Sequence, residues 1–171
     1  SIDFDFFSPQ SFDPRKLSAR LSELGSFSEE VAKGISLIGV FSGVKMSYFQ
    51  YEYPLIAKTT QYMDVSIAHP HDIAAMKLVA ITDRGTRKDF VDLYELVHQG
   101  VSIDDMFRFY DTKYKLFQTN RFTLIKALSY FDEADADTMP ELIKHVIWEE
   151  VKTFFVSESM RLAKTYLEES P

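Results

Sequence analysis

The sequence has 171 residues, of which 46% are hydrophobic and 15% aromatic; it contains no cysteine and carries a net charge of −7. This composition excludes the disordered class, and the lack of cysteine excludes a disulfide framework, a thiolate metal site and a cysteine nucleophile. No apolar run approaches the roughly 20 residues that cross a bilayer, so we expect no membrane association and a cytoplasmic protein.

The chain opens with Ser-Ile-Asp-Phe-Asp-Phe-Phe, in which apolar residues alternate with Asp3 and Asp5. A period of two predicts a strand. The two carboxylates then project from one face, about 7 Å apart at their Cα atoms, and can converge on a hard cation such as Mg2+ or Mn2+. The apolar neighbours favour a buried strand, where acids need a cation as partner. The alternative is an edge strand with a solvated polar face.

A predicted helix and a strand-rich region come next. Residues 13–24 have a helical pattern, with Asp13 as the N-cap and Pro14 at the first helical position. Between residues 34 and 68, aromatic and β-branched residues broken by glycines predict two or three antiparallel strands joined by tight turns. Further short strands are predicted over residues 55–57 and 63–67.

The rest of the chain has helical periodicity. Helices are predicted over residues 71–83 and 88–98, from a cap at Ser102, over 119–131, and over 140–168 as one long helix or two, with an acidic solvated connection over 132–138. A strand-rich part followed by a helical part predicts an α+β fold. We therefore expect a small mixed or antiparallel sheet over residues 1–70 and a helical bundle over residues 71–171.

Lys77 lies on the apolar face of the predicted helix, because Ile73 and Ile81 are four residues away on either side. A lysine in an apolar stripe either extends its ammonium to solvent or meets a fixed anion. The anion could be a triphosphate or a group of carboxylates. The sequence leaves these readings open.

A third group of charged residues surrounds the start of the helix predicted from residue 88. Arg84, Arg87 and Lys88 flank a helix N-terminus, where unpaired backbone N–H groups and the helix dipole favour anions. Asp89 and Asp92 follow three residues apart on one helical face. The alternative is that these acids only stabilise the helix N-terminus and pair with the neighbouring basic side chains.

In these motifs the sequence resembles the AbiEii/AbiGii-type nucleotidyltransferase toxin family. The resemblance covers roughly residues 1–98 and rests on the opening Asp-x-Asp strand, on Asp-Ile-Ala-Ala-Met-Lys ending at Lys77, and on Arg-Gly-Thr-Arg-Lys-Asp-Phe-Val-Asp-Leu-Tyr-Glu-Leu starting at Arg84. Asp-x-Asp alone is not specific, whereas Lys77 together with Lys88-Asp89 is.

The resemblance implies a nucleotidyltransferase fold and a function. The implied reaction is magnesium-dependent transfer of a nucleotide from an NTP to an acceptor, which can be a tRNA end. The implied setting is a bacterial toxin–antitoxin or phage-defence system, with an antitoxin protein as partner. The implied site residues are the metal ligands Asp3 and Asp5, the catalytic Asp89, and the substrate-binding Lys77, Lys88, Arg84 and Asp92. Asp64, on the strand predicted over 63–67, is the rival third carboxylate.

One element of the family pattern does not occur in this sequence. A Gly-Gly or Gly-Ser turn and a helix precede the Asp-x-Asp strand in the family, whereas this sequence starts at Ser1. We therefore expect either a start inside the domain or a catalytically reduced relative that acts as a protein-interaction module. A metal-dependent nuclease is a third alternative, because paired carboxylates also serve phosphodiester hydrolysis.

Overall fold

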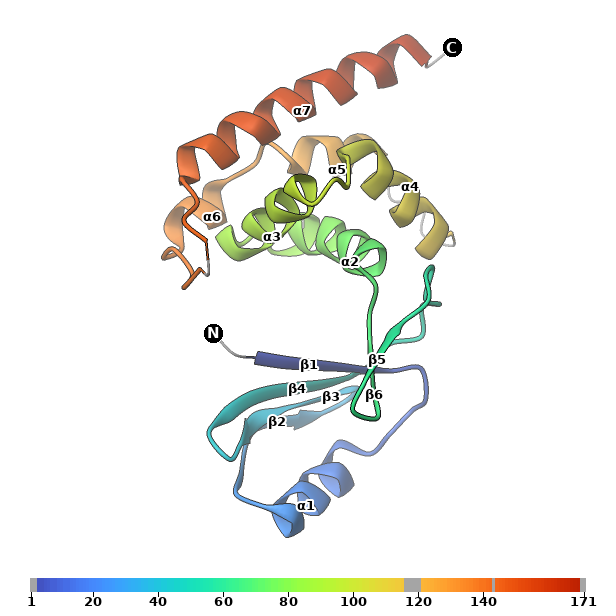
Figure 1. The fold of residues 1–171 in the computed structure, drawn as a ribbon, viewed down its shortest axis with the longest axis vertical. Coiled ribbons are helices and arrows are strands. Elements are labelled where there is room, and N and C mark those ends of the chain that lie inside the picture. The colour runs from blue at the N-terminus through green and yellow to red at the C-terminus, as the bar shows by residue number, and fades with distance from the viewer. Residues whose placement is uncertain (1–2, 116–120, 143, 170–171) are drawn as a thin grey trace. The chain divides into compact units, whose positions relative to one another are not determined.

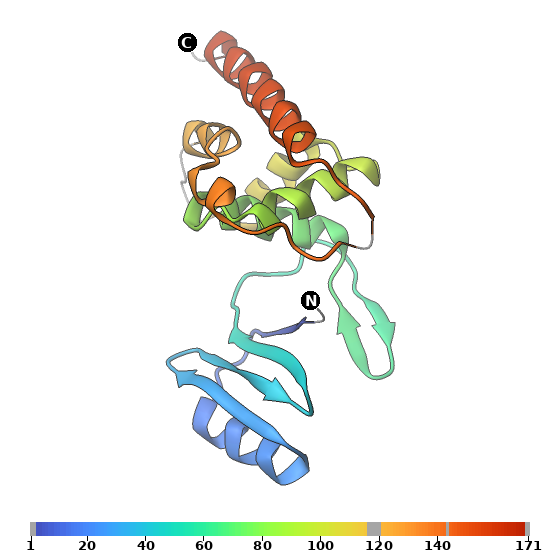
Figure 2. The same cartoon turned by 90° about the vertical axis from the view of Figure 1, so that its left-hand side faces the viewer.

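The computed structural model describes residues 3–115, 121–142 and 144–169 (Figures 1 and 2). The chain divides into two compact units, Ser1–Pro54 and Leu55–Pro171. The first unit contains β1 (Asp3–Ser8), α1 (Pro14–Leu24), β2 (Phe27–Lys33), β3 (Ser36–Phe41) and β4 (Val44–Gln50). The second contains β5 (Thr60–Tyr62), β6 (Val65–Ile67), α2 (Pro70–Asp83), α3 (Arg87–His98), α4 (Ile103–Lys113), α5 (Arg121–Ala127), α6 (Asp132–Ala136) and α7 (Trp148–Glu169). This arrangement confirms the predicted α+β class.

The sheet of the first unit is mixed, with the order β1-β4-β3-β2. Strands β2, β3 and β4 pair antiparallel in sequence order, and β1 pairs parallel with β4. The tight turn between β3 and β4 is formed by Ser42 and Gly43, both with positive φ (50° and 85°). The predicted strand at the start of the chain is confirmed for Asp3–Ser8, while Ser1 and Ile2 lie outside the described residues.

Helix α1 packs against β2 and β3 on one face of this sheet. The Ser18 hydroxyl, buried on α1, donates a hydrogen bond to the carboxylate of Glu29 on β2. Glu29 pairs with Gly39 on β3, so Gly39 and Leu37, two residues away, share the face that α1 covers. Leu37 is 1% exposed and forms the centre of this small core.

The N-cap predicted for α1 is present. The Asp13 carboxylate accepts hydrogen bonds from the backbone N–H groups of Arg15 (3.0 Å) and Lys16 (3.2 Å). We expect Asp13→Ala to lower the free energy of unfolding by about 1 kcal/mol, because two N–H groups of the first turn lose their acceptor. Chemical denaturation measures this loss, and Asp13→Asn, which keeps a side-chain acceptor, is expected to recover most of it. Equal stability of the alanine and asparagine variants would contradict the capping role.

The second unit begins with an irregular segment and the hairpin β5–β6, which stands apart from the helices (Figure 2). The helices then pack α2 against α3, α4 and α5, and α7 against α3 and α5. Their shared core consists of side chains with almost no exposure: Ala74, Ala75, Leu78, Phe90, Leu93, Met106, Leu124, Leu128, Val151 and Phe155. No helix among the described residues is both long enough and apolar enough to cross a membrane.

Several local predictions were wrong. Residues 55–57 form no strand, because the backbone N–H groups of Ile56 and Ala57 donate to a side-chain carboxylate instead of a neighbouring strand. Strand β2 was not predicted: its charged residues lie at an exposed edge of the sheet. Part of the acidic connection over 132–138 folds into the short helix α6. Helix α7 begins at Trp148, eight residues after the predicted start at 140.

Candidate functional site

Five polar side chains gather where α2 meets α3: Lys77, Arg84, Thr86, Asp89 and Asp92. The Lys77 ammonium lies 3.0 Å from Asp89 Oδ1 and 2.5 Å from Asp92 Oδ2. The Lys77 side chain is 19% exposed, so its charge is largely removed from water and is held by two acids. Of the readings that the sequence left open, the structure shows a lysine that meets carboxylates.

Asp89 is the centre of this cluster. Its side chain has no exposed surface, and both of its oxygens accept two hydrogen bonds. Oδ1 accepts from Lys77 Nζ (3.0 Å) and from the guanidinium of Arg84 (2.9 Å), and Oδ2 accepts from Arg84 Nε (2.8 Å) and from the Thr86 hydroxyl (2.6 Å). A buried carboxylate with this many donors is fully satisfied.

These contacts shift the acid–base properties of the cluster. Burial by itself would raise the pKa of Asp89, but the hydrogen bonds from Arg84 and Thr86 and the charge of Lys77 outweigh it and hold the pKa well below its usual range. Burial would likewise lower the pKa of Lys77, but the hydrogen bond and charge of Asp92, reinforced by Asp89, raise it above its usual value. Both groups are therefore charged at neutral pH.

A short turn creates this geometry. Helix α2 ends at Asp83, and Gly85 has a φ of 54°, a backbone conformation that glycine adopts at no steric cost. Thr86 then has the extended backbone of an N-cap, and its hydroxyl donates to the Asp89 side chain three residues ahead. The sequence analysis did not identify Thr86 as a residue of the site. The signal that could have identified it is a hydroxyl residue three positions before an acid at the start of a helix.

The remaining basic residues at the start of α3 have other surroundings. The Arg87 guanidinium donates to the carbonyl oxygens of Ala134 (2.9 Å) and Asp135 (3.2 Å) and lies 5.0 Å from the centre of the Trp148 ring. Its backbone N–H donates to Asp137 (3.1 Å). Arg87 therefore holds the acidic segment over 132–138, which includes α6, against the start of α3. Lys88, predicted to bind substrate, is exposed on the first turn of α3.

The paired acids of the opening motif lie on β1, at an edge of the sheet among the described strands. Asp3 pairs with Lys45 and Asp5 with Ser47 across the β1–β4 ladder. Through the strand registers, these residues belong to the face opposite the one that carries Leu37 and α1. Both acids are exposed, so the expectation of a buried strand was wrong. An alternating pattern specifies the faces of a strand but not its neighbours.

Asp64, the rival third carboxylate, is not on a strand. It forms the tip of the β5–β6 hairpin with Met63, and both residues have positive φ (50° and 45°). Asparagine and aspartate tolerate this conformation in hairpin turns, which is the local reason for its position. Within the ranges that the structure describes, no three histidine, aspartate or glutamate side chains gather as a metal site.

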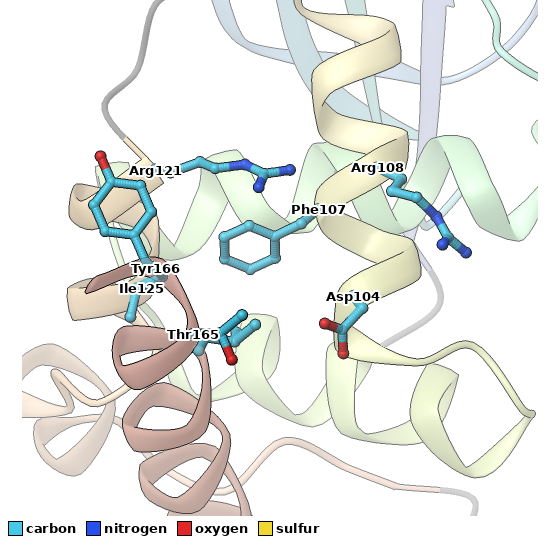
Figure 3. Close-up of a pocket in the computed structure, with 8 residues that line it drawn as sticks. Asp104, Phe107, Arg108, Arg121, Ile125, Thr165 and Tyr166 are labelled. Carbon is cyan, nitrogen blue, oxygen red and sulfur yellow. The ribbon is translucent and has the colours of Figure 1, made fainter. Parts of the chain in front are cut away.

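A pocket of about 210 Å³ lies between α4, α5 and α7 (Figure 3). Phe107 points into it from α4, and Thr165 and Tyr166 line it from α7. Its charged residues pair within the chain: Asp104 accepts from Arg161, and Arg121 lies 2.7 Å from Asp111. The rim charges are thus mutually neutralised, and we assign no ligand to this pocket.

Comparison with known proteins adds to this geometry. The family model described as "Nucleotidyl transferase AbiEii toxin, Type IV TA system" matches residues 35–163. The matched region extends further into the helical part than the sequence resemblance did, and it contains the whole Lys77–Asp89 cluster but not Asp3 or Asp5.

An uncharacterized protein of Aquifex aeolicus (strain VF5) is 34% identical over 173 aligned positions, covering 98% of this chain and 80% of that protein. No solved structure matches the chain. The family implies nucleotidyl transfer and an antitoxin partner. With three quarters of its length matched, this chain belongs to the AbiEii family of nucleotidyl transferase toxins of type IV toxin–antitoxin systems.

Proposed function

We propose that this chain transfers a nucleotide from an NTP to an acceptor hydroxyl in a Mg2+-dependent reaction, and that the acceptor is the end of a tRNA. The observation that carries the proposal is the Lys77 ammonium, held by Asp89 and Asp92 inside the residues that match the family. A cation that is fixed before substrate arrives can stabilise developing negative charge without reorganising.

Lys77 is the residue that we place against the triphosphate. An ammonium has three N–H groups, and the contacts described for Lys77 use two of them, one to each acid. The third can donate to a phosphate oxygen. Positive charge at this point offsets the charge that develops on the leaving pyrophosphate. Arg84, 61% exposed at its side chain, lies beside it as a second donor.

The contacts of Asp89 favour a positioning role over direct metal ligation. All four hydrogen bonds to its oxygens are donated by Lys77, Arg84 and Thr86, which are groups that could also donate to the phosphate oxygens of a nucleotide. Asp89 therefore sets the position of the two cations that face the substrate. Asp92 is 37% exposed at its side chain and is the more accessible acid of the cluster.

The metal would be held by Asp3 and Asp5. Their carboxylates come from one face of β1, are exposed, and are the hard oxygen donors that Mg2+ or Mn2+ prefers, so the residues fit the ion. When bound, the ion would supply Lewis-acid stabilisation of the triphosphate. Ser47, the partner of Asp5 on β4, leaves room beside these carboxylates because its side chain is small.

The test is transfer of label from each of the four NTPs to tRNA in the presence of Mg2+. We expect Lys77→Met to lower kcat/KM by about 100-fold, because a fixed charge at the reacting phosphates is lost. Lys164→Met is the matched control: this lysine is 79% exposed and pairs only loosely with Glu168 (3.9 Å), so transfer should be unchanged. No transfer by the unaltered chain with any NTP, together with no heat of Mg-NTP binding, would refute the enzyme and favour the interaction module.

A further inference from the structure

A second buried ion pair lies in the helical unit, away from the Lys77 cluster. Asp72 in the first turn of α2 and Lys113 in the last turn of α4 are 0% and 3% exposed, and their charged atoms are 2.7 Å apart. Buried pairs of this kind are often no more stabilising than apolar residues of similar size. Its presence therefore calls for a role that an apolar pair could not fill.

The Asp72 carboxylate has such a role. It accepts hydrogen bonds from the backbone N–H of Ile56 (3.1 and 3.3 Å to its two oxygens) and of Ala57 (3.2 Å). Among the described residues, neither of these N–H groups donates to a backbone carbonyl, so the carboxylate is their acceptor. Lys113 balances the charge that the carboxylate brings into the interior.

The position of Ile56 and Ala57 in the chain gives the pair its significance. The first unit ends at Pro54 and the second begins at Leu55, so Ile56 and Ala57 are the second and third residues of the second unit. Asp72 is also five residues before Lys77 on the same helix. The Asp72 carboxylate thus joins three parts of the unit: the segment at Ile56 and Ala57, the start of α2 and the end of α4.

We propose that Asp72, charge-balanced by Lys113, anchors the connection between the two units at Ile56 and Ala57 and is a positioning residue for nucleotide transfer. The transfer part rests on the proposed function, in which Lys77, five residues further along α2, contacts the triphosphate. The anchored segment is bound to the first turn of α2, so it helps to fix the start of the helix that carries Lys77. Without the carboxylate, the two N–H groups exchange their acceptor for water and the connection detaches.

Two double variants separate the anchor from the ion pair. Asp72→Asn/Lys113→Met and Asp72→Leu/Lys113→Met both remove the charges. Asparagine and leucine have the same number and branching of side-chain heavy atoms as aspartate, but only asparagine retains an oxygen that can accept from Ile56 and Ala57. In hydrogen exchange without nucleotide, we expect the leucine variant to exchange these two amides at least about tenfold faster than the asparagine variant. Amides of α2 near Leu78 should stay equally protected in both.

The same two double variants are then compared in the nucleotide-transfer assay. We expect kcat/KM to be about tenfold lower for the leucine variant than for the asparagine variant, because a positioning defect lowers the fraction of productive geometry. Equal amide exchange in the two variants would overturn the anchor, and equal kcat/KM would overturn its positioning role. Should the leucine variant not fold, Ala57→Pro removes one donor directly, and unchanged kcat/KM in that variant would also overturn it.

Amide hydrogen exchange is measured without nucleotide, so the proposed transfer function and the proposed Asp72 anchor can be refuted independently of one another. An unaltered chain that transfers no nucleotide refutes the proposed function and, with it, the positioning role. The anchor itself is decided in either case by the exchange rates of Ile56 and Ala57.

Discussion

Asp5→Ala is expected to abolish transfer of labelled nucleotide while the protein remains folded. Asp5 is exposed on the edge strand β1, so its removal costs little packing. In the proposed reaction it is one of two carboxylates that hold the metal, and a single remaining carboxylate binds Mg2+ poorly. Transfer from NTP should fall to the level of the EDTA-treated unaltered protein, and excess Mg2+ should restore the unaltered protein but not the variant.

Glu30→Ala is the control for this experiment. Glu30 is an acid on β2 of the same sheet, exposed, with only a distant pairing to Lys45 (4.0 Å). It should leave both transfer and the circular dichroism spectrum unchanged. An Asp5→Ala variant that still transfers at the rate of the unaltered protein would remove the Asp-x-Asp strand from the site and point to the Lys77 cluster alone.

Asp89→Asn is expected to give the largest loss of stability together with loss of transfer. The carboxylate is completely buried and accepts four hydrogen bonds, two of them from Arg84. In the asparagine variant the side-chain NH2 group cannot accept, so it faces N–H or O–H donors that lose their acceptor. The charge of Lys77 also loses one of its two compensating carboxylates. Breaking a buried pair in this way costs about 3–5 kcal/mol. Urea denaturation measures this cost, and Asp92→Asn, at a position 37% exposed, should cost much less.

The same variant should change the dependence of stability on pH. The pKa of Asp89 is lower in the folded protein than in the unfolded chain, so its contribution is fully present above the unfolded pKa, about 4. The contribution is lost as the pH falls below that value toward the folded pKa. The difference in unfolding free energy between the unaltered protein and Asp89→Asn should therefore be constant near neutrality and shrink in acid. A difference that grows in acid would contradict the depressed pKa.

The sequence predicted what depends on neighbours along the chain. Asp13 and Ser102 were recognised as caps because their partners lie within three residues. Lys77 was recognised as lying on an apolar face, with its partner left open, and Asp89 was recognised as part of a helix start, both from spacing alone. The proximity of these two groups follows from the short turn at Gly85, which joins α2 to α3 and allows the two helices to pack together.

Other features depend on partners that are distant in sequence and carry no local signal. Asp72 binds Ile56, 16 residues earlier, and Lys113, 41 residues later. Arg87 was expected to attract a ligand anion, yet its backbone N–H meets Asp137, 50 residues away. Such pairs form because of the way in which separate segments pack against one another. The spacing of residues within one helix does not predict this packing.

The balanced charges of the Lys77 cluster affect how a nucleotide would arrive. Two cations, Lys77 and Arg84, stand against two anions, Asp89 and Asp92, within hydrogen-bonding distance, so the cluster has almost no field beyond its immediate surroundings. The chain as a whole carries −7 and repels an anionic nucleotide at long range. In the proposed reaction, electrostatic attraction would therefore not speed the encounter with the nucleotide. Since added salt screens the repulsion, the association rate should rise with ionic strength, the reverse of what a basic nucleotide-binding cleft shows.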